Sequence, residues 1–359
     1  MGLPKDSNLN LYSKWKAGER NLITDVPGIK VGNVTVEDEA KDIHTGVTAI
    51  LPHGGNLFQD KVMAGVSVIN GFGKSIGLVQ IDEIGSIETP IILTNTLNVG
   101  VAWNAVTRYM LAQNEDIGLK TGTVNCVITE CNDGRINDIR GLHVTEENVT
   151  DAIAAADVDF EEGAVGGGTG MVCLGLKGGI GSASRIVPVD GKDYTVGALV
   201  MSNFGGAGNL VIGGKHYNTK CYSNTELFDL NKDKGSIIMV IATDIPLSER
   251  QLKRVAKRAT ISLGRVGSYC GNGSGDVAIA FTTANRLSHY SDKNILDMKM
   301  FYDEELDMVF ESAVEAVEEA IISSLYHAKT KGGVLKKTWM GLQEFIETYG
   351  DGQNVEEAK

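Results

Sequence analysis

The sequence predicts a mixed α/β fold in which one-sided helices pack in layers on buried sheets. Short β-branched runs bounded by Gly, Pro, Asn or Asp are typical of strands. Longer segments carry apolar residues at three- and four-residue spacing, which is typical of helices. Since neither an internal repeat nor a low-complexity linker divides the chain, we expect residues 1–359 to form a single intertwined domain.

The elements are expected in the following order. The first strands cover residues 28–36, 45–53, 62–71 and 90–97, and a second group covers residues 124–130, 170–176, 194–205, 235–244 and 276–285. Helices are expected over residues 98–113, from 145 with an acidic first turn, from 248 to 265, and over 303–327. Ser248 and Gln251 form a capping box at the start of the third helix. Residues 351–359 are expected to be a flexible tail.

Composition excludes several classes of protein. Lysine and arginine number 33 against 46 aspartate and glutamate residues, and the net charge of −13 argues against a general nucleic-acid or anionic-membrane binder. No signal-peptide core and no long apolar span are visible, and five cysteines without C-x-x-C spacing suggest reduced thiols. We therefore expect a cytoplasmic location.

Glycine is in excess, with 44 residues, while only 6 prolines and no Gly-X-Y period are present, which excludes collagen. Much of this excess lies in the runs 163–181, 205–214 and 264–275. We expect these runs to form loops around a tight site, because glycine allows close approach of the backbone.

Local motifs for other chemistries are weak. The stretch GFGKSIG contains G-x-S-x-G around Ser75, but the residues after it show neither a clear strand nor a clear helix, which a nucleophile elbow needs. The letters GKS lack the first glycine of a Walker A loop, and GGGTG at 166–170 does not fit G-x-G-x-x-G. The six histidines show no local spacing for a metal site. On spacing alone, a Ser-His-Asp triad assembled by folding stays open.

Gly235 and Ser236 stand directly before a run of six apolar residues, so a small hydroxyl group lies at the mouth of a predicted buried strand. By pattern alone, this is an ordinary turn that begins a strand.

The chain resembles the DmpA family of self-processing aminopeptidases, which includes the β-aminopeptidases and the L-aminopeptidase/D-amidase-esterase. The resemblance extends over nearly the whole chain. The matching stretches are ITDVPGIKVGNVT, TGVTAILPH, NGFGKSIGLVQIDEIGSIETPIILTNTLNVG, ECNDGRINDIRG, GAVGGGTGMVCLGLKGGIGSASR, GSIIMVIATDIPLSERQLKR and GNGSGDVAIAFTTANR.

This resemblance implies a four-layer αββα sandwich of the DmpA and ornithine-acetyltransferase type, similar to N-terminal-nucleophile hydrolases. It implies that the precursor cuts itself between Gly235 and Ser236 into an α-chain, 1–235, and a β-chain, 236–359. Ser236 would then be an N-terminal nucleophile, and its α-amine, with a pKa near 8, can act as general base. The implied substrates are small peptides, amides or esters, with no metal ion or other cofactor, and the implied assembly is a homotetramer.

The same resemblance assigns roles to five further residues. Ser274 and Asp276 would orient the nucleophile and its amine, and Asp276 stands where the β-aminopeptidases have glutamate. Asn203 would help to form the oxyanion hole. Glu130 would pair with the free ammonium of the substrate, and Asn132 stands where the family often has an aromatic residue near the substrate.

Two alternatives stay open. An acyltransferase of the ornithine-acetyltransferase type would pass the acyl group to an amine instead of water, although those enzymes use threonine as nucleophile. A non-catalytic, ligand-binding member would stay uncut.

Overall fold

The computed structural model describes residues 9, 11–222 and 233–353 of the chain. Most of its strands form two sheets. The four-stranded sheet has the order β1-β2-β5-β6, with β1 Lys30–Asp38, β2 Ile43–Leu51, β5 Ile91–Asn95 and β6 Val127–Cys131. The six-stranded sheet has the order β4-β3-β14-β13-β10-β9, with β4 Ser86–Ile87, β3 Asp60–Gly71, β14 Gly273–Ser288, β13 Lys234–Thr243, β10 Lys192–Asn203 and β9 Gly179–Val189.

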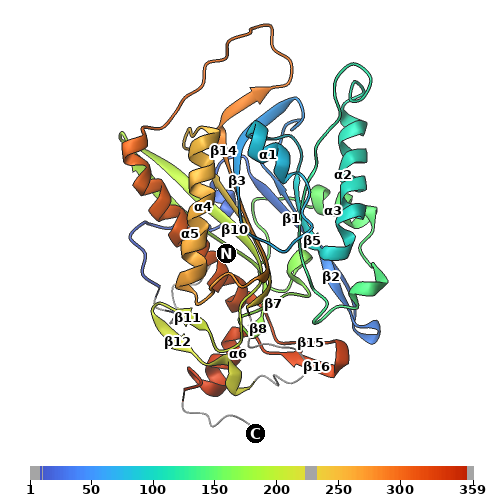
Figure 1. The fold of residues 1–359 in the computed structure, drawn as a ribbon, viewed down its shortest axis with the longest axis vertical. Coiled ribbons are helices and arrows are strands. Elements are labelled where there is room, and N and C mark those ends of the chain that lie inside the picture. The colour runs from blue at the N-terminus through green and yellow to red at the C-terminus, as the bar shows by residue number, and fades with distance from the viewer. Residues whose placement is uncertain (1–8, 10, 223–232, 354–359) are drawn as a thin grey trace.

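The two sheets pack face to face between two layers of helices (Figure 1). Apolar side chains from both sheets share the central core, for example Val31 and Leu93 of the smaller sheet with Met201, Val240 and Ile279 of the larger one. The larger sheet is covered on its outer face by α4 Glu249–Arg265 and α5 Leu306–His327, and the smaller sheet by α2 Val99–Gln113 and α3 Glu146–Ala154. The predicted αββα sandwich is therefore confirmed.

Helix starts follow the capping signals in the sequence. Ser248 Oγ accepts a hydrogen bond from the backbone N–H of Gln251 at 3.3 Å, and Gln251 Oε1 accepts one from the N–H of Ser248 at 3.1 Å. Thr145 and Asn148 make the same reciprocal pair at the start of α3. Each pair satisfies two backbone donors that a helix start would leave unbonded. The four predicted helices are thus confirmed within a few residues at each end.

One predicted strand is wrong. Residues 170–176 were expected to run straight, whereas the structure has a hairpin of β7 Val172–Cys173 and β8 Leu176–Lys177. Leu174 and Gly175, between these strands, have φ values of 52° and 86°. Two consecutive left-handed residues make the tight turn that reverses a chain between antiparallel strands. The apolar pattern is the same for one strand as for two, so it did not show the reversal.

Several elements have no counterpart in the sequence prediction. The structure adds the strand β9 and two short helices, α1 Leu78–Ile84 and α6 Leu342–Tyr349. It also adds two hairpins, β11 Leu210–Ile212 with β12 Lys215–Tyr217, and β15 Lys331–Gly333 with β16 Lys337–Trp339. Short elements and glycine-rich strands carry little periodic signal.

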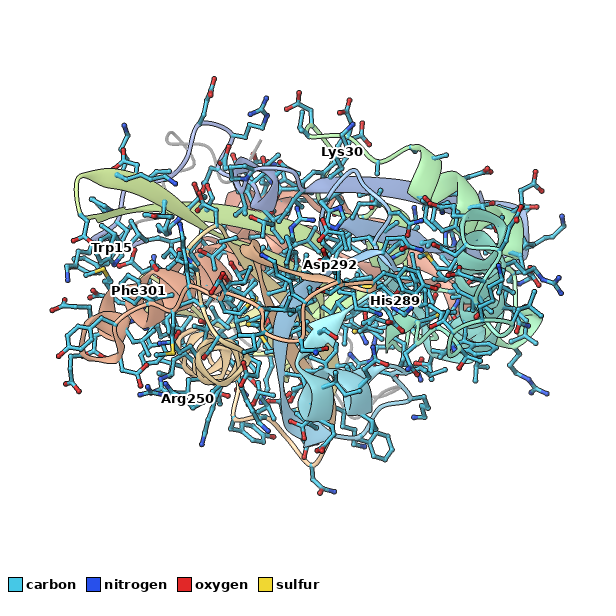
Figure 2. The ribbon with its side chains drawn as sticks, turned by 90° about the horizontal axis from the view of Figure 1, so that it is seen from above. Trp15, Lys30, Arg250, His289, Asp292 and Phe301 are labelled. Carbon is cyan, nitrogen blue, oxygen red and sulfur yellow. The ribbon has the colours of Figure 1, made fainter. Side chains whose placement is uncertain are left out.

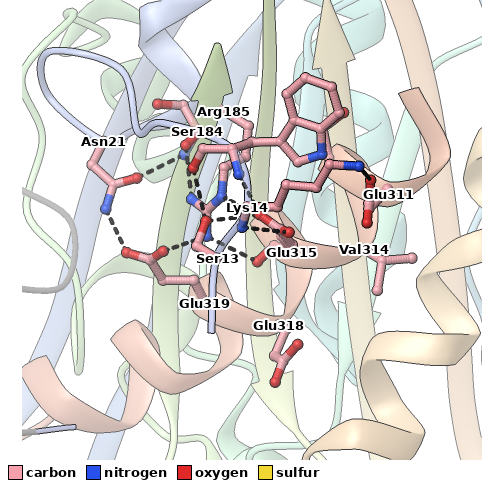
Figure 3. Close-up of polar contacts among 12 residues, drawn as sticks. Ser13, Lys14, Asn21, Ser184, Arg185, Glu311, Val314, Glu315, Glu318 and Glu319 are labelled. Carbon is pink, nitrogen blue, oxygen red and sulfur yellow. Dashed lines mark hydrogen bonds and ion pairs between the residues drawn. The ribbon is translucent and has the colours of Figure 1, made fainter. Parts of the chain in front are cut away.

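The segment before the first strand is held against α5 by a buried ionic cluster (Figure 3). Arg185, on β9, donates to Glu315 at 3.2 Å and to Glu319 at 2.6 Å, and its side chain is 2% exposed. Ser13 Oγ donates to Glu315 at 2.7 Å, and Asn21 Nδ2 donates to Glu319 at 2.5 Å. These contacts fasten residues 13–21 to the outer helical layer.

Residues 289–302 cross the top of the sandwich between the two helical sides (Figure 2). At one end His289 shares a hydrogen bond of 2.8 Å with Thr121, and at the other end the carbonyl of Phe301 accepts one of 2.7 Å from Gln251 on α4. Near the C-terminus, the carbonyl of Asp351 accepts a hydrogen bond from Asn218 at 2.8 Å. The first residues of the expected tail therefore contact the domain, and residues 354–359 lie outside the described ranges.

In the part of the chain described here, no helix has both the length and the apolar character needed to cross a bilayer.

Candidate active site

Ser236 lies at the start of β13, in the middle of the larger sheet. On the antiparallel strand β10, Ser236 pairs with Asn203. On the parallel strand β14, it pairs with Gly275, so Ser274 and Asp276 lie on either side of its partner. Ser236 is buried. Thus the order of strands brings four predicted site residues, which are far apart in the sequence, to one end of adjacent strands. Residues 223–232, which precede this strand, lie outside the described residues.

The peptide bond before Ser236 has an unusual backbone setting. Gly235 has a φ of 139°, a conformation that L side chains rarely adopt. A Cβ at this position would lie 1.9 Å from the carbonyl oxygen of Asn203, which is an impossible contact. The Oγ of Ser236 donates a hydrogen bond of 2.5 Å to the Gly235 carbonyl oxygen. The hydroxyl is therefore next to the carbonyl of the Gly235–Ser236 bond, and only glycine fits before it.

Ser274 and Asp276 form a pair on the neighbouring strand. Ser274 Oγ donates to Oδ1 of Asp276 at 2.6 Å, and both side chains are buried. Burial raises the pKa of Asp276 to about 6; the bond from Ser274 opposes this rise and the negative charge of Asp233 adds to it. Asp276 Oδ2 is buried without a hydrogen-bond donor among the described residues. The pair can therefore accept one more donor.

Asn203 has its side-chain amide fixed from both ends. Its Oδ1 accepts a hydrogen bond from the backbone N–H of Val172 at 2.9 Å, and its Nδ2 donates to the carbonyl of Asn132 at 2.9 Å. These bonds determine which amide atom is the donor. An Nδ2 group has two hydrogens, so one is left that could stabilise a developing oxyanion.

Glu130 lies near the end of β6, on the facing sheet, and is 2% exposed. Its Oε1 accepts from the backbone N–H of Lys74 at 2.8 Å, and its Oε2 accepts from the hydroxyl of Thr96. Both of these donors are neutral, and a carboxylate makes its stronger hydrogen bonds with cationic donors. Such a group can bind a substrate ammonium.

The loop 72–77 brings the two sheets together at this site. A Cβ on Gly73 would lie 3.2 Å from Glu130 Oε1 and 3.9 Å from the Cα of Gly275, and one on Gly275 would lie 3.0 Å from Ser236 Oγ. Glu130 and Ser236 are therefore separated by little more than two glycine residues. At Gly275 the backbone of the loop takes the place of a side chain, since the same Cβ would lie 2.6 Å from the carbonyl oxygen of Phe72.

Asn132 takes part through its backbone. Its carbonyl accepts the bond from Asn203, whereas its exposed side chain accepts from the N–H of Gly134 at 2.9 Å and so stabilises a turn.

Some contacts were not anticipated from the sequence. Thr96 and the Lys74 N–H hold Glu130, and Gly73 lies in the stretch GFGKSIG. This stretch follows β3 and precedes α1, so the strand and the helix that the sequence did not show beside its G-x-S-x-G match are both present. The signal that could have indicated this loop is its place in one of the long stretches shared with the DmpA family. The hydrogen bonds of Ser236, Ser274 and Asp276 within the described ranges involve no histidine.

No three His, Cys, Asp or Glu side chains in the described ranges are grouped to hold a metal ion. A cavity of 790 Å³ lies elsewhere, and its lining includes Phe160, Glu162, His327 and Lys331.

Comparison with known families agrees with the geometry. The model of peptidase family S58 matches residues 21–339. The chain belongs to peptidase family S58. The family resemblance stated from the sequence is therefore confirmed.

Individual relatives of this S58 chain cover most of its length. It is 40% identical over 351 residues to beta-peptidyl aminopeptidase BapA of Sphingosinicella microcystinivorans, with 92% of this chain and 87% of the relative covered. The structure of the PH0078 protein from Pyrococcus horikoshii OT3 matches at 49% identity and a TM-score of 0.89, with 96% and 98% covered. The L-aminopeptidase D-Ala-esterase/amidase from Ochrobactrum anthropi, described as a variant of the Ntn hydrolase fold, matches at 36% identity and a TM-score of 0.85, also with 96% and 98% covered.

Proposed function

We propose that this serine aminopeptidase of family S58 uses Ser236 as its nucleophile, after cutting its own chain between Gly235 and Ser236. The observation that carries the proposal is the position of the Ser236 hydroxyl, 2.5 Å from the carbonyl oxygen of the bond to be cut. The products would be an α-chain, 1–235, and a β-chain, 236–359, which stay together as one intertwined domain. Strand β13 supports the expected association of the two chains, because it begins before the Gly235–Ser236 bond and continues after it within a single sheet.

Self-cleavage proceeds in two balanced steps. The Oγ of Ser236 attacks the carbonyl carbon of Gly235, the C–N bond breaks, and the proton lost by the hydroxyl ends on the new amine. Water then hydrolyses the ester and leaves a carboxylate on Gly235 and a free amine and hydroxyl on Ser236. Asp276 Oδ2 supports this, because it has no donor among the described residues and is an acceptor suited to the ammonium form of that amine.

Peptide hydrolysis repeats the chemistry with an outside substrate. The neutral α-amine of Ser236 takes the proton of its own hydroxyl, which attacks the first carbonyl of the substrate. Asn203 donates to the oxyanion, and Glu130 pairs with the ammonium of the substrate. The released amine leaves first, and water then frees the N-terminal residue from the acyl-enzyme on Ser236. A substrate without a free ammonium would leave Glu130 unpaired, which favours aminopeptidase over endopeptidase activity.

The proposed substrates are small peptides, amino-acid amides and esters, in agreement with relatives named as a β-peptidyl aminopeptidase and an aminopeptidase with esterase and amidase activity. Water, not an amine, is the proposed acyl acceptor, since these relatives are named as hydrolases. Product analysis with and without an added amine acceptor separates hydrolysis from acyl transfer.

We further propose a homotetramer in the cytoplasm. All five cysteines are free, and four of them are buried, which suits a reducing compartment. Light scattering on the purified protein measures the assembly.

Intact mass tests the central proposal. The wild-type chain should separate under denaturing conditions into fragments 1–235 and 236–359, while Ser236→Ala stays whole. Wild-type protein should also release p-nitroaniline from amino-acid p-nitroanilides. A single full-length species for both chains, without such activity, would refute the proposal and favour a non-catalytic, ligand-binding member.

A further inference from the structure

Asp233 is a buried carboxylate that the proposed reaction does not use. It lies three residues before Ser236, on the α-chain side of the cut, and it is 2% exposed. A buried carboxylate is costly unless several donors compensate for the lost water. Its partners therefore indicate what it holds in place.

The carboxylate of Asp233 accepts three hydrogen bonds. Oδ1 accepts from the N–H of Gly205 at 2.9 Å, and Oδ2 accepts from Ser268 Oγ at 2.6 Å and from the N–H of Tyr269 at 3.2 Å. Its own backbone N–H donates to Tyr269 Oη at 2.9 Å. Hydrogen bonds thus fix both the side chain and the backbone of Asp233.

The partners of Asp233 belong to the segments that carry the predicted site residues. Gly205 follows Asn203 by two residues, and Ser268 and Tyr269 lead to Ser274 on β14. The packing is close along this path, since a Cβ on Gly271 would lie 2.0 Å from the carbonyl oxygen of Asp233. One carboxylate therefore connects the oxyanion segment, the scissile segment and the Ser274 segment.

We infer that Asp233 is a positioning residue for self-cleavage, which holds the Gly235 carbonyl against the Ser236 hydroxyl. This inference rests on the proposed function. Only Lys234 and Gly235 separate the held residue from the nucleophile, so fixing Asp233 limits the positions that the Gly235 carbonyl can take. Holding two reacting groups at contact distance accounts for a large part of the rate advantage of an intramolecular reaction.

The rate of self-cleavage tests this inference. Freshly translated full-length chain is followed over time by denaturing gel electrophoresis and intact mass. Asp233→Asn keeps the size of the side chain but loses its charge and one acceptor oxygen, and we expect its precursor half-life to lengthen about tenfold or more. Tyr269→Phe removes only the hydroxyl that binds the Asp233 backbone, and we expect it to lengthen the precursor half-life about two- to fivefold. Asp292→Asn, at an exposed position, is the matched control and should process at the wild-type rate.

A second variant separates positioning by charge from simple filling of space. Asp233→Glu keeps the charge and both acceptor oxygens, and should process faster than Asp233→Asn, whereas a space-filling role predicts the reverse order because asparagine matches aspartate in size. The inference is overturned if Asp233→Asn processes within twofold of the wild type, or if the Glu variant is the slower one. Failure of the proposed function looks different, since the wild type itself would then stay uncut.

Discussion

Ser274 Oγ donates a 2.6 Å hydrogen bond to Asp276 Oδ1, on the strand that runs parallel to the one carrying Ser236. The second oxygen of Asp276 is buried and has no donor in the described ranges. In the uncut chain, this oxygen can therefore accept a further donor. A new ammonium group on Ser236 would supply the missing donor.

The raised pKa of Asp276 predicts a pH dependence for the uncut chain. Because the folded-state value of about 6 lies above the usual 3.8, the protonated form favours folding. The stabilisation from this group is complete below about pH 4 and is lost as the pH rises from there through 6, to an extent of roughly 3 kcal/mol. Urea unfolding of Ser236→Ala between pH 4 and 8 measures it.

The control for this pH effect is the double variant Ser236→Ala, Asp276→Asn, in which the titrating group is absent. Its stability should fall less between pH 4 and 7 than that of Ser236→Ala alone. Parallel pH curves for the two proteins would show that Asp276 titrates normally and contradict the prediction.

Asn203 is predicted to contribute to kcat. Asn203→Ala should lower kcat about 10²- to 10³-fold, because the remaining hydrogen on Nδ2 is the proposed oxyanion donor. Asn203→Asp keeps the acceptor that binds Val172 but has no N–H to donate, so it should lose similar activity. Both variants are assayed as processed protein with an amino-acid p-nitroanilide. A kcat within threefold of the wild type for either variant would rule out the oxyanion role.

Glu130 is predicted to recognise the free ammonium of the substrate. Glu130→Gln should raise KM for substrates with a free N-terminus about tenfold or more, since a charge-assisted hydrogen bond is lost. Steady-state kinetics with free and N-acetylated p-nitroanilides measure the effect. The wild type should discriminate strongly between the two substrates and Glu130→Gln should discriminate weakly; equal discrimination by both enzymes would argue against the pairing.

Arg185 is predicted to be a major contributor to stability. Arg185→Met leaves the buried Glu315 and the partly buried Glu319 without their shared cation, which should cost about 3–5 kcal/mol of unfolding free energy. Arg250→Met is a matched comparison, because Arg250 pairs with Asp303 at the exposed surface. This substitution should lower the unfolding free energy by less than about 1 kcal/mol. Chemical denaturation of both variants in the Ser236→Ala background gives the difference, and equal losses would contradict it.

Long, regular elements were predictable because their signals are local. The capping pair Ser248 and Gln251 and the apolar face of α5 follow from neighbouring residues alone. The turn at Leu174 and Gly175 was not predictable in the same way, because a left-handed leucine is unfavourable by itself and requires the surrounding packing to impose it. The roles of Asp233 and Thr96 depend on contacts with residues far along the chain, which no local pattern contains.

The sequence by itself determined the fold class, the family and the residues worth examining, because helix caps, apolar periodicity and long shared stretches are all present in the order of residues. Only the tertiary structure decided how these residues meet. Strand pairing placed Ser236 between Asn203 and Gly275, and packing of the second sheet brought Glu130 to the same place. Burial then raised the pKa of Asp276, since the free energy of a charge depends on the water and charges around it.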